Sequence, residues 1–257
     1  MTTKFILFLD IDGTLAELQA HPNDAFIPFT TLRLLQQLQH YCTLFLITGR
    51  CIQDTSHLLP SNHFNIIGSH GAEIQYADQH AAQPLLAINH SAIQTLYDYV
   101  KQQHTAWQPV WIELKPYSIA FHYRQHPEAA TLAKIAASAC IEQCPEFMLK
   151  AGKCVYEVVL KGIHKGAAIE KICSSHTQHM PIFIGDDVTD EDGFQMVNQL
   201  NGCSIKVGAE PTKALFQVNN VTEVAALLQQ FLSQFKLYTA PMEGESICPD
   251  SLSYPTG

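Results

Sequence analysis

The sequence predicts an α/β protein: a Rossmann-like, doubly wound parallel sheet with an inserted α+β domain that contains a four-stranded antiparallel sheet. Two observations predict this fold. Short apolar runs with neither a helical nor an alternating period, each ending in polar residues, are typical of parallel strands buried on both faces. A central stretch instead alternates apolar and polar residues between helical segments, which is typical of an antiparallel sheet with one covered face. The 257 residues, 47% of them hydrophobic, are enough for two modest domains.

The first predicted strand, Phe5–Leu9, ends in the carboxylates Asp10 and Asp12, which are followed by Gly13 and Thr14. In open α/β sheets, ligands bind at the carboxyl ends of the strands. In one arrangement Asp10 projects into the crevice from the end of the strand, while Asp12 lies in the turn that Gly13 permits. A carboxylate in this place can accept a phosphoryl group, and water can then hydrolyse the aspartyl-phosphate.

A second strand follows through a helix. Residues 16–29 form a turn-rich connection, and the apolar spacing from Thr30 to Leu38 predicts an amphipathic helix. The apolar run Thr43–Ile47 predicts the second buried strand, and its order after a helix implies a right-handed parallel crossover. We also expect a helix around residues 51–58 and a short strand at Asn65–Gly68.

Two residues after the second strand suit contact with a phosphate. Thr48 offers a hydroxyl, and Gly49 offers a backbone that can be approached closely. N–H groups at the start of the next helix would assist them. Thr-Gly pairs commonly end strands, so the pattern gains weight only beside the acidic motif of the first strand.

The middle of the chain predicts a separate layer. Its elements follow an αββαββ order, which predicts a four-stranded antiparallel sheet with helices on one face. They are helices at His90–His104 and Pro127–Cys144 and strands at Trp111–Leu114, Ser118–Tyr123, Phe147–Leu149 and Cys154–Val159. We therefore assign residues 87–159 to the inserted domain, 1–86 and 160–238 to the parallel core, and 239–257 to a weakly ordered tail.

A second acidic motif follows when the core resumes. Lys165 precedes an alanine-rich helix at Ala167–Cys173, and Met180–Ile184 predicts a further buried strand. That strand runs into Gly185 and the segment Asp186–Asp192, where five of seven residues are acidic. Carboxylates at the end of a buried strand predict a metal site, and an oxygen-rich donor set suits Mg²⁺. A strand at Cys203–Gly208 and a helix at Val221–Phe235 are expected to complete the core.

Together these motifs resemble those of the haloacid dehalogenase-like (HAD) phosphatase superfamily. The resemblance implies that Asp10 attacks the phosphoryl group, Asp12 transfers a proton, and Thr48 hydrogen-bonds the phosphoryl oxygens. It also implies that Lys165 pairs with Asp10 and the phosphate. Mg²⁺ would be held by Asp10, Asp186 and the main-chain oxygen of Asp12. The inserted domain would be the cap that closes over the substrate.

The resemblance extends to further residues of the core. It implies that Asp187 and Asp190 orient the metal's water ligands or Lys165. Gly49, Arg50 and His70 are expected to contribute to substrate binding, and the resemblance places His70 near the mouth of the cleft.

The cap segments are similar to those of trehalose-6-phosphate phosphatases. The similarity lies in Glu113-Leu114-Lys115, Phe121-His122-Tyr123-Arg124 and Gly152-Lys153 with Glu157. It implies that Glu113, Lys115, Glu157 and Arg124 contact the sugar, since charged groups at fixed spacing can hydrogen-bond many hydroxyls. The implied activity is Mg²⁺-dependent hydrolysis of trehalose 6-phosphate through an aspartyl-phosphate, the last step of trehalose biosynthesis. Thr48 stands where that family often has Ser.

Other functions remain open at this point. A HAD phosphatase of another sugar phosphate, such as sucrose phosphate or mannosyl-phosphoglycerate, would share these motifs, as would a phosphomutase. A non-catalytic sugar-phosphate sensor would not need Asp12. A signalling receiver domain carries its lysine last, whereas Lys165 precedes the second acidic motif.

Composition and charge indicate which binding partners and which cellular compartment to expect. The net charge of −9 argues against nucleic-acid binding, and no run of about 18 apolar residues predicts a membrane span. The eight cysteines are scattered without a Cys-x-x-Cys pair, which predicts reduced thiols. With no signal peptide visible, we expect a cytoplasmic protein. The resemblance implies a small-molecule sugar phosphate as its partner, and we expect a monomer.

Overall fold

The computed structural model describes residues 4–19, 21–59, 63–152 and 154–238. The chain divides into two compact units, residues 1–86 with 164–257 and residues 87–163. The tail predicted at residues 239–257 and Lys153 of the cap motif lie outside the described residues.

The larger unit is built on an eight-stranded sheet of order β12-β11-β10-β1-β2-β3-β4-β5. The strands from β12 to β3 run parallel, whereas β4 and β5 are antiparallel additions at one edge. This places β1 at the centre, between β10 and β2. The strands are β1 (Lys4–Leu9), β2 (Thr43–Ile47), β3 (Asn65–Gly68), β4 (Glu73–Gln75), β5 (Gln83–Pro84), β10 (His179–Gly185), β11 (Cys203–Val207) and β12 (Phe216–Val218).

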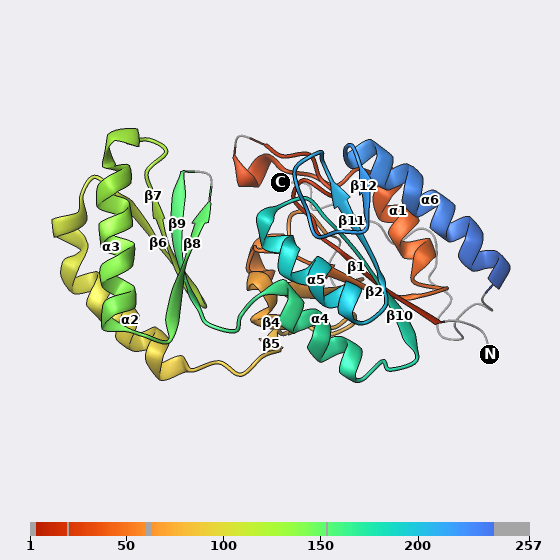
Figure 1. Cartoon of the computed structure of the whole chain (residues 1–257), viewed down its shortest axis with the longest axis horizontal. Helices are drawn as coiled ribbons and strands as arrows, with labels where there is room; N and C mark the ends of the chain where they lie inside the picture. The colour runs from red at the N-terminus through yellow and green to blue at the C-terminus, as the bar shows by residue number, and fades with distance from the viewer. Residues whose placement is uncertain (1–3, 20, 60–62, 153, 239–257) are drawn as a thin grey trace. The chain divides into compact units, whose positions relative to one another are not determined.

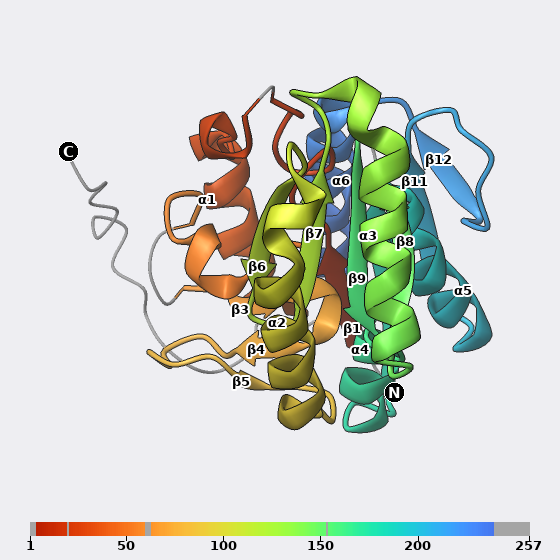
Figure 2. The ribbon, with the colours of Figure 1, turned by 90° about the vertical axis from the view of Figure 1, so that its left-hand side faces the viewer.

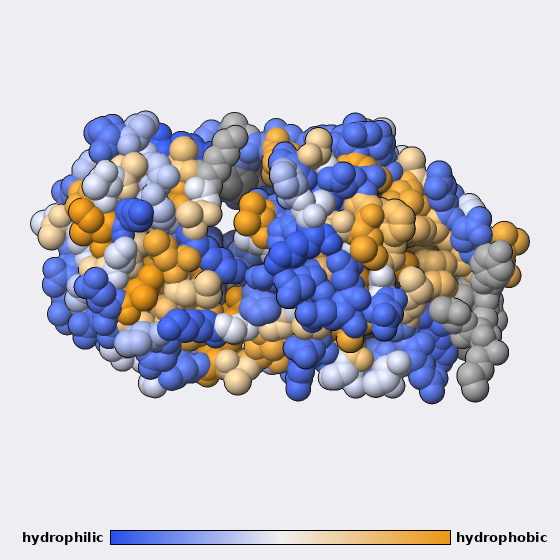
Figure 3. Space-filling view, in the orientation of Figure 1, coloured by the Kyte–Doolittle hydropathy of each residue, from blue (hydrophilic) through white to orange (hydrophobic). Residues whose placement is uncertain are grey.

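Helices cover both faces of this sheet, as Figure 1 shows. Leu7 and Leu9 of β1 pack in one apolar cluster with α1 (Phe29–Leu38) and α6 (Val221–Tyr238). Ile6 and Phe8 point to the opposite face and pack with α4 (Lys165–Ser174) and α5 (Glu191–Gln199). The apolar run of β1 is therefore buried on both sides, which confirms the predicted doubly wound fold. Hydrophilic residues gather over the outer side of α5 in Figure 3.

The α-helix predicted around residues 51–58 does not form. The segment forms only a 3₁₀ turn, Ile52–Thr55. The Thr55 hydroxyl donates to the carbonyl of Ile52 at 2.7 Å, a local bond that competes with a helical ladder. The N–H of Ile52 donates to Glu73 Oε1 at 3.0 Å instead of lying open at a helix start. The expected anion site at a helix N-terminus is therefore absent from this described segment.

The smaller unit is the α+β layer that the central pattern predicts. Its sheet has the order β6-β7-β9-β8, with strands at Trp111–Lys115, Ser118–His122, Val155–Leu160 and Phe147–Gly152. Figures 1 and 2 show α2 (His90–Gln103) and α3 (Ala130–Gln143) on the same face of that sheet. Small residues of α3 are buried there, which lets the helix approach the strands closely: Ala133, Ala136, Ala137 and Cys140.

Strand alternation separates the two faces of the cap sheet. Ile119, Phe121 and Val158 are buried among the apolar residues. The residues between them, such as Ala120 and Glu157, face the other way and are paired across the strands. Polar side chains therefore gather on the face opposite the cap helices. Among the described residues, no helix is both long enough and apolar enough to cross a bilayer.

Candidate active site

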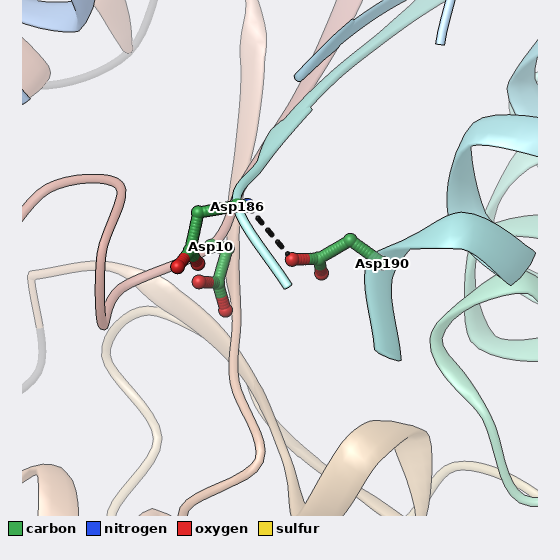
Figure 4. A group of neighbouring side chains, drawn as sticks. All are labelled: Asp10, Asp186 and Asp190. Atoms are coloured by element: carbon green, nitrogen blue, oxygen red, sulfur yellow. Dashed lines mark hydrogen bonds between the residues drawn. The ribbon is translucent and has the colours of Figure 1, made fainter. Parts of the chain in front are cut away.

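Two carboxylates meet where the central strands of the core end. Asp10 directly follows β1, Asp186 directly follows β10, and the two strands are parallel with Leu9 opposite Ile184. The N–H of Asp10 donates to the carbonyl of Ile184 at 2.9 Å, which continues the pairing by one residue. Figure 4 shows the carboxyl groups of Asp10 and Asp186 close together at this point, with Asp190 directed toward them.

Lys165 places a buried ammonium group among these acids. It begins α4, and its side chain is 2% exposed. Its Nζ donates to Oδ1 of Asp10 and to Oδ1 of Asp190, each at 2.5 Å. The preceding residue, His164, caps the helix by accepting from the N–H of Ala167 at 3.2 Å, which fixes where the helix begins. The position of Lys165 is therefore set by the start of α4.

Asp190 holds the loop after β10 in place. Its Oδ2 accepts from the N–H groups of Asp186 and Asp187, each at 2.9 Å, while its Oδ1 binds Lys165. The side chain of Asp187 in turn caps the short 3₁₀ turn that contains Asp190. A Cβ on Gly185 would lie 2.5 Å from Asp190 Cγ, so only glycine leaves room for this carboxyl group. Both oxygens of Asp190 are thus engaged within the protein.

Asp186 carries an oxygen that has no partner among the described residues. Gly13 has a φ of +83°, and a Cβ there would lie 2.0 Å from Asp186 Oδ2, so the turn after β1 must be glycine. Oδ1 of Asp186 is buried and accepts no hydrogen bond from the described residues. Buried polar atoms are nearly always paired, so this oxygen indicates a ligand that the protein itself does not supply.

A second buried lysine, which the sequence analysis missed, supports Asp186 from β11. Lys206 is 3% exposed, and its Nζ donates to the main-chain oxygen of Asp186. Its other charged neighbour is Glu210, 3.6 Å away and largely exposed. A lysine in the middle of an apolar strand was the available signal, because buried lysines need a partner.

The cluster holds more negative than positive charge. Among the described residues, the carboxyl groups of Asp10 and Asp190 bind one ammonium, that of Lys165, and a second ammonium, that of Lys206, binds the main chain of Asp186, so three carboxyl groups lie beside two ammonium groups. Burial raises the pKa of Asp10 well above its ordinary value; Lys165 opposes this shift, and Asp190 and Asp186 add to it. Burial, followed by the Asp190 charge, raises the pKa of Asp186 to about 6. Burial alone would lower the pKa of Lys165, but the charges of Asp10 and Asp190 raise it.

These residues fit a divalent cation. Ligand oxygens of Asp10, Asp186 and Asp190 lie within 4.8 Å of one another. The donor set is all oxygen, the excess charge is negative, and Oδ1 of Asp186 lacks a partner among the described residues. A hard cation such as Mg²⁺ suits each of these properties.

Asp12 and Arg50 form a second ion pair in the core. Arg50 Nε donates to Asp12 Oδ2 at 2.7 Å, and a terminal nitrogen donates to Oδ1 at 2.5 Å. This bidentate fork raises the pKa of Arg50, mainly through the hydrogen bond to Asp12. The main chain of Arg50 also donates to the buried Thr48 hydroxyl at 3.1 Å. The predicted acid is therefore held by a residue predicted to bind substrate.

His70 lies against Gly49 at the end of β2. A Cβ on Gly49 would lie 2.6 Å from the imidazole Cε1, so glycine allows this contact. His70 itself has a φ of +57°, a conformation uncommon for a residue with a side chain. The preceding Ser69 hydroxyl donates to Glu73 Oε1 at 2.8 Å, which anchors the turn.

The predicted sugar contacts of the cap lie together on its polar face, apart from Arg124. Glu157 Oε1 accepts from the Ser118 hydroxyl at 2.7 Å and lies 3.4 Å from Lys115 Nζ. Glu113 Oε2 lies 2.9 Å from His122 Nε2, and this hydrogen bond is the main cause that lowers the pKa of Glu113. Arg124 is exposed in the bend after β7. Ser118 and His122 were not predicted as site residues, although cross-strand neighbours of charged residues were candidates.

Comparison with known proteins identifies related chains. Residues 8–222 match the family model described as trehalose-phosphatase. The chain is 33% identical over 236 residues to a trehalose-6-phosphate phosphatase of Escherichia coli, covering 89% of this chain and 87% of the relative. It is 32% identical over 234 residues to a probable trehalose-phosphate phosphatase of Sinorhizobium fredii, covering 87% and 85%.

Solved structures share the fold. The C-terminal domain of a trehalose-6-phosphate phosphatase of C. albicans matches with a TM-score of 0.75 at 18% identity, covering 90% of this chain and 93% of that one. A trehalose-6-phosphate phosphatase related protein matches with a TM-score of 0.69 at 24% identity, covering 90% and 99%. At these identities, the likeness concerns the fold alone.

Proposed function

Because the chain belongs to the trehalose-phosphatase family and is a phosphoric monoester hydrolase, we propose that it hydrolyses trehalose 6-phosphate to trehalose and inorganic phosphate. The observation that carries this proposal is the buried Lys165 ammonium, 2.5 Å from Asp10 Oδ1 at the end of the central strand. A carboxylate can attack an anionic phosphoryl group only where nearby positive charge offsets their repulsion. Phosphoryl transfer depends mainly on such positioning and charge neutralisation.

In the proposed first step, Asp10 is the nucleophile. Its Oδ1 is held by Lys165, so we assign the attack to Oδ2. A bond forms between this oxygen and phosphorus while the bond from phosphorus to the sugar oxygen breaks. Asp12 gives its proton to the departing sugar oxygen, and the product is trehalose with an aspartyl-phosphate at Asp10. The Thr48 hydroxyl is assigned to a phosphoryl oxygen.

In the second step, water attacks the phosphorus of the aspartyl-phosphate. Asp12, now ionised, takes the proton from that water, and inorganic phosphate leaves as the Asp10 carboxylate is restored. We assign Mg²⁺ to Asp10, Asp186 and the main-chain oxygen of Asp12, with Asp187 and Asp190 as supporting residues. When bound, the cation would offset the negative charge of the phosphoryl group and of the carboxylates.

The fork between Arg50 and Asp12 suggests how the acid is released. Both oxygens of Asp12 accept hydrogen bonds from Arg50, so Asp12 must leave this pair before it can carry a proton. A guanidinium fork fits a phosphoryl group as well as a carboxylate. We propose that the substrate phosphate competes for Arg50 and thereby frees Asp12.

We propose that the cap determines sugar specificity through contacts of four side chains with the sugar: Glu113, Lys115, Glu157 and Arg124. The hydrogen bonds that already hold Glu113 and Glu157 support this role, because fixed polar groups recognise hydroxyls with little loss of entropy. All described cysteines are free thiols, which supports the proposed cytoplasmic location.

A substrate panel tests the proposal. Phosphate release is measured from trehalose 6-phosphate, sucrose 6-phosphate, mannosyl-phosphoglycerate and glucose 6-phosphate, each with Mg²⁺ or with EDTA. We expect the highest kcat/KM for trehalose 6-phosphate and activity only with the cation. Equal or better hydrolysis of another sugar phosphate would assign a different substrate, and full activity in EDTA would exclude the metal.

A further inference from the structure

One aromatic residue of the cap lies on its polar face without an assigned role. Trp111 begins β6, an edge strand of the cap sheet, and it is 61% exposed. The sequence has two tryptophans, and the other, Trp107, is 7% exposed among apolar neighbours. Large exposed aromatic side chains often mark binding surfaces, because they offer a wide apolar area together with one polar group.

The Trp111 side chain is held in a fixed orientation. Its ring stacks on His122, with centroids 4.4 Å apart and planes 26° apart. His122 is fixed in turn, because its Nε2 lies 2.9 Å from Glu113 Oε2. The imidazole covers one face of the indole, while the high exposure of Trp111 leaves surface for a second flat partner. Binding there would cost little side-chain entropy.

The surroundings of Trp111 indicate the chemistry of that partner. Strand alternation and the pairing of Trp111 with His122 place Trp111, Glu113 and Lys115 on the same face. A pyranose ring presents C–H groups on its flat side and hydroxyls around its edge. An indole plate beside a carboxylate and an ammonium matches both features, since the C–H face can stack while the hydroxyls are hydrogen-bonded.

We infer that Trp111, supported by His122, is a stacking platform for a pyranose ring, and that it contributes to sugar specificity. The inference rests on the proposed function only for the identity of the sugar, which would be part of trehalose 6-phosphate. The competing explanation is that Trp111 and His122 form a cross-strand pair that only stabilises the sheet. A stabilising pair would affect unfolding and leave sugar affinity unchanged.

A fluorescence titration tests the platform on the full chain without catalysis. Tryptophan emission is followed while trehalose is added to the wild type and to Trp111→Phe, with sorbitol as a polyol that lacks a ring. We expect a saturable change in the wild type with trehalose, no change with sorbitol, and none in Trp111→Phe, whose remaining Trp107 is buried. A change that persists in Trp111→Phe, or no change in the wild type, would overturn the inference.

Kinetics of Trp111→Ala give a second readout. We expect KM for trehalose 6-phosphate to rise about tenfold, the effect of losing a stacked ring, with kcat within about twofold. Hydrolysis of acetyl phosphate, which has no sugar, should stay at the wild-type rate. Ile135→Ala, a matched control that is 57% exposed on α3, should leave all values unchanged. A KM within about twofold of wild type in Trp111→Ala would contradict the platform.

The two proposals fail in different ways. If the wild type does not hydrolyse trehalose 6-phosphate, the proposed function is wrong, and the titration with trehalose still decides whether Trp111 binds a sugar. If the wild type hydrolyses trehalose 6-phosphate but Trp111→Ala behaves like Ile135→Ala, the function stands and the platform is wrong.

Discussion

Replacing Asp186 by asparagine should stabilise the metal-free protein while it removes activity. Asp186 is packed against Gly13, and its Oδ1 has no partner among the described residues. Asparagine has the same shape, cannot ionise, and can donate an amide hydrogen toward Asp10. The change removes one of the negative charges that the buried cluster carries in excess.

The size of this effect follows from the pKa of Asp186, which is about 6 in the folded protein against an ordinary value of 3.8. The folded state therefore binds the proton more tightly than the unfolded chain does. At low pH the carboxyl group is protonated in both states, and stability is lost as pH rises from about 4 through about 6. The shift corresponds to about 3 kcal/mol, so Asp186→Asn should exceed wild type by up to that amount at pH 8.

Chemical denaturation in EDTA at several pH values between 4.5 and 8 measures the difference. The gain of Asp186→Asn should grow with pH and level off above pH 6. Added Mg²⁺ should stabilise wild type by mass action and have less effect on the variant. Glu17→Gln, which changes an exposed carboxylate of the same unit, is the control and should follow the wild type at each pH. A variant no more stable than wild type at pH 8 would refute the reasoning about buried charge.

Three further substitutions test the contacts around the cluster. Lys165→Met leaves two buried carboxylates without their cation, so it should cost about 3–5 kcal/mol in denaturation experiments; a loss below about 1 kcal/mol would contradict the buried pairing. Arg50→Ala should lower kcat/KM in the wild type, because it removes both a partner of the substrate phosphate and the group that holds Asp12. The loss should be smaller in Asp12→Asn, where only the phosphate contact remains to be lost, and fully additive losses in this double-mutant cycle would show that the two residues act independently. Lys206→Met should raise the Mg²⁺ concentration for half-maximal activity about tenfold, since groups that orient metal ligands tune affinity, and an unchanged concentration would remove this support for Asp186.

The longer parallel strands of the core could be predicted because their signal is local. Phe5–Leu9 and Thr43–Ile47 are continuous apolar runs, and a strand buried on both faces requires that pattern. The fold class follows from their order with the helices between them. The three shortest strands, β4, β5 and β12, could not be predicted. The strand β5, for example, consists of the two exposed residues Gln83 and Pro84 and gains its structure from pairing with β4.

The site was predictable only in part, for a related reason. Asp10 and Asp186 stand at strand ends, so their sequence neighbours reveal their position. The two hydrogen bonds from Arg50 to Asp12 join residues that are 38 positions apart, and no local sequence pattern predicts them. The partner of Lys206 is a main-chain oxygen, which a sequence pattern cannot specify. The expected helix at 51–58 is reduced to the 3₁₀ turn Ile52–Thr55, and the acceptor of the Ile52 N–H is Glu73 from β4, a partner that no local pattern predicts.

The central claim, that Asp10 takes the phosphoryl group, is tested most directly by trapping the covalent intermediate. Acetyl phosphate labelled in the phosphoryl group is mixed with Asp12→Asn in Mg²⁺, quenched in acid, and the labelled peptide is mapped. Acetate needs no acid to leave, whereas water attack lacks its base, so the label should accumulate. The account predicts label on Asp10 and none in the double variant Asp10→Asn with Asp12→Asn. Label on another residue, or label that survives the loss of Asp10, would contradict it.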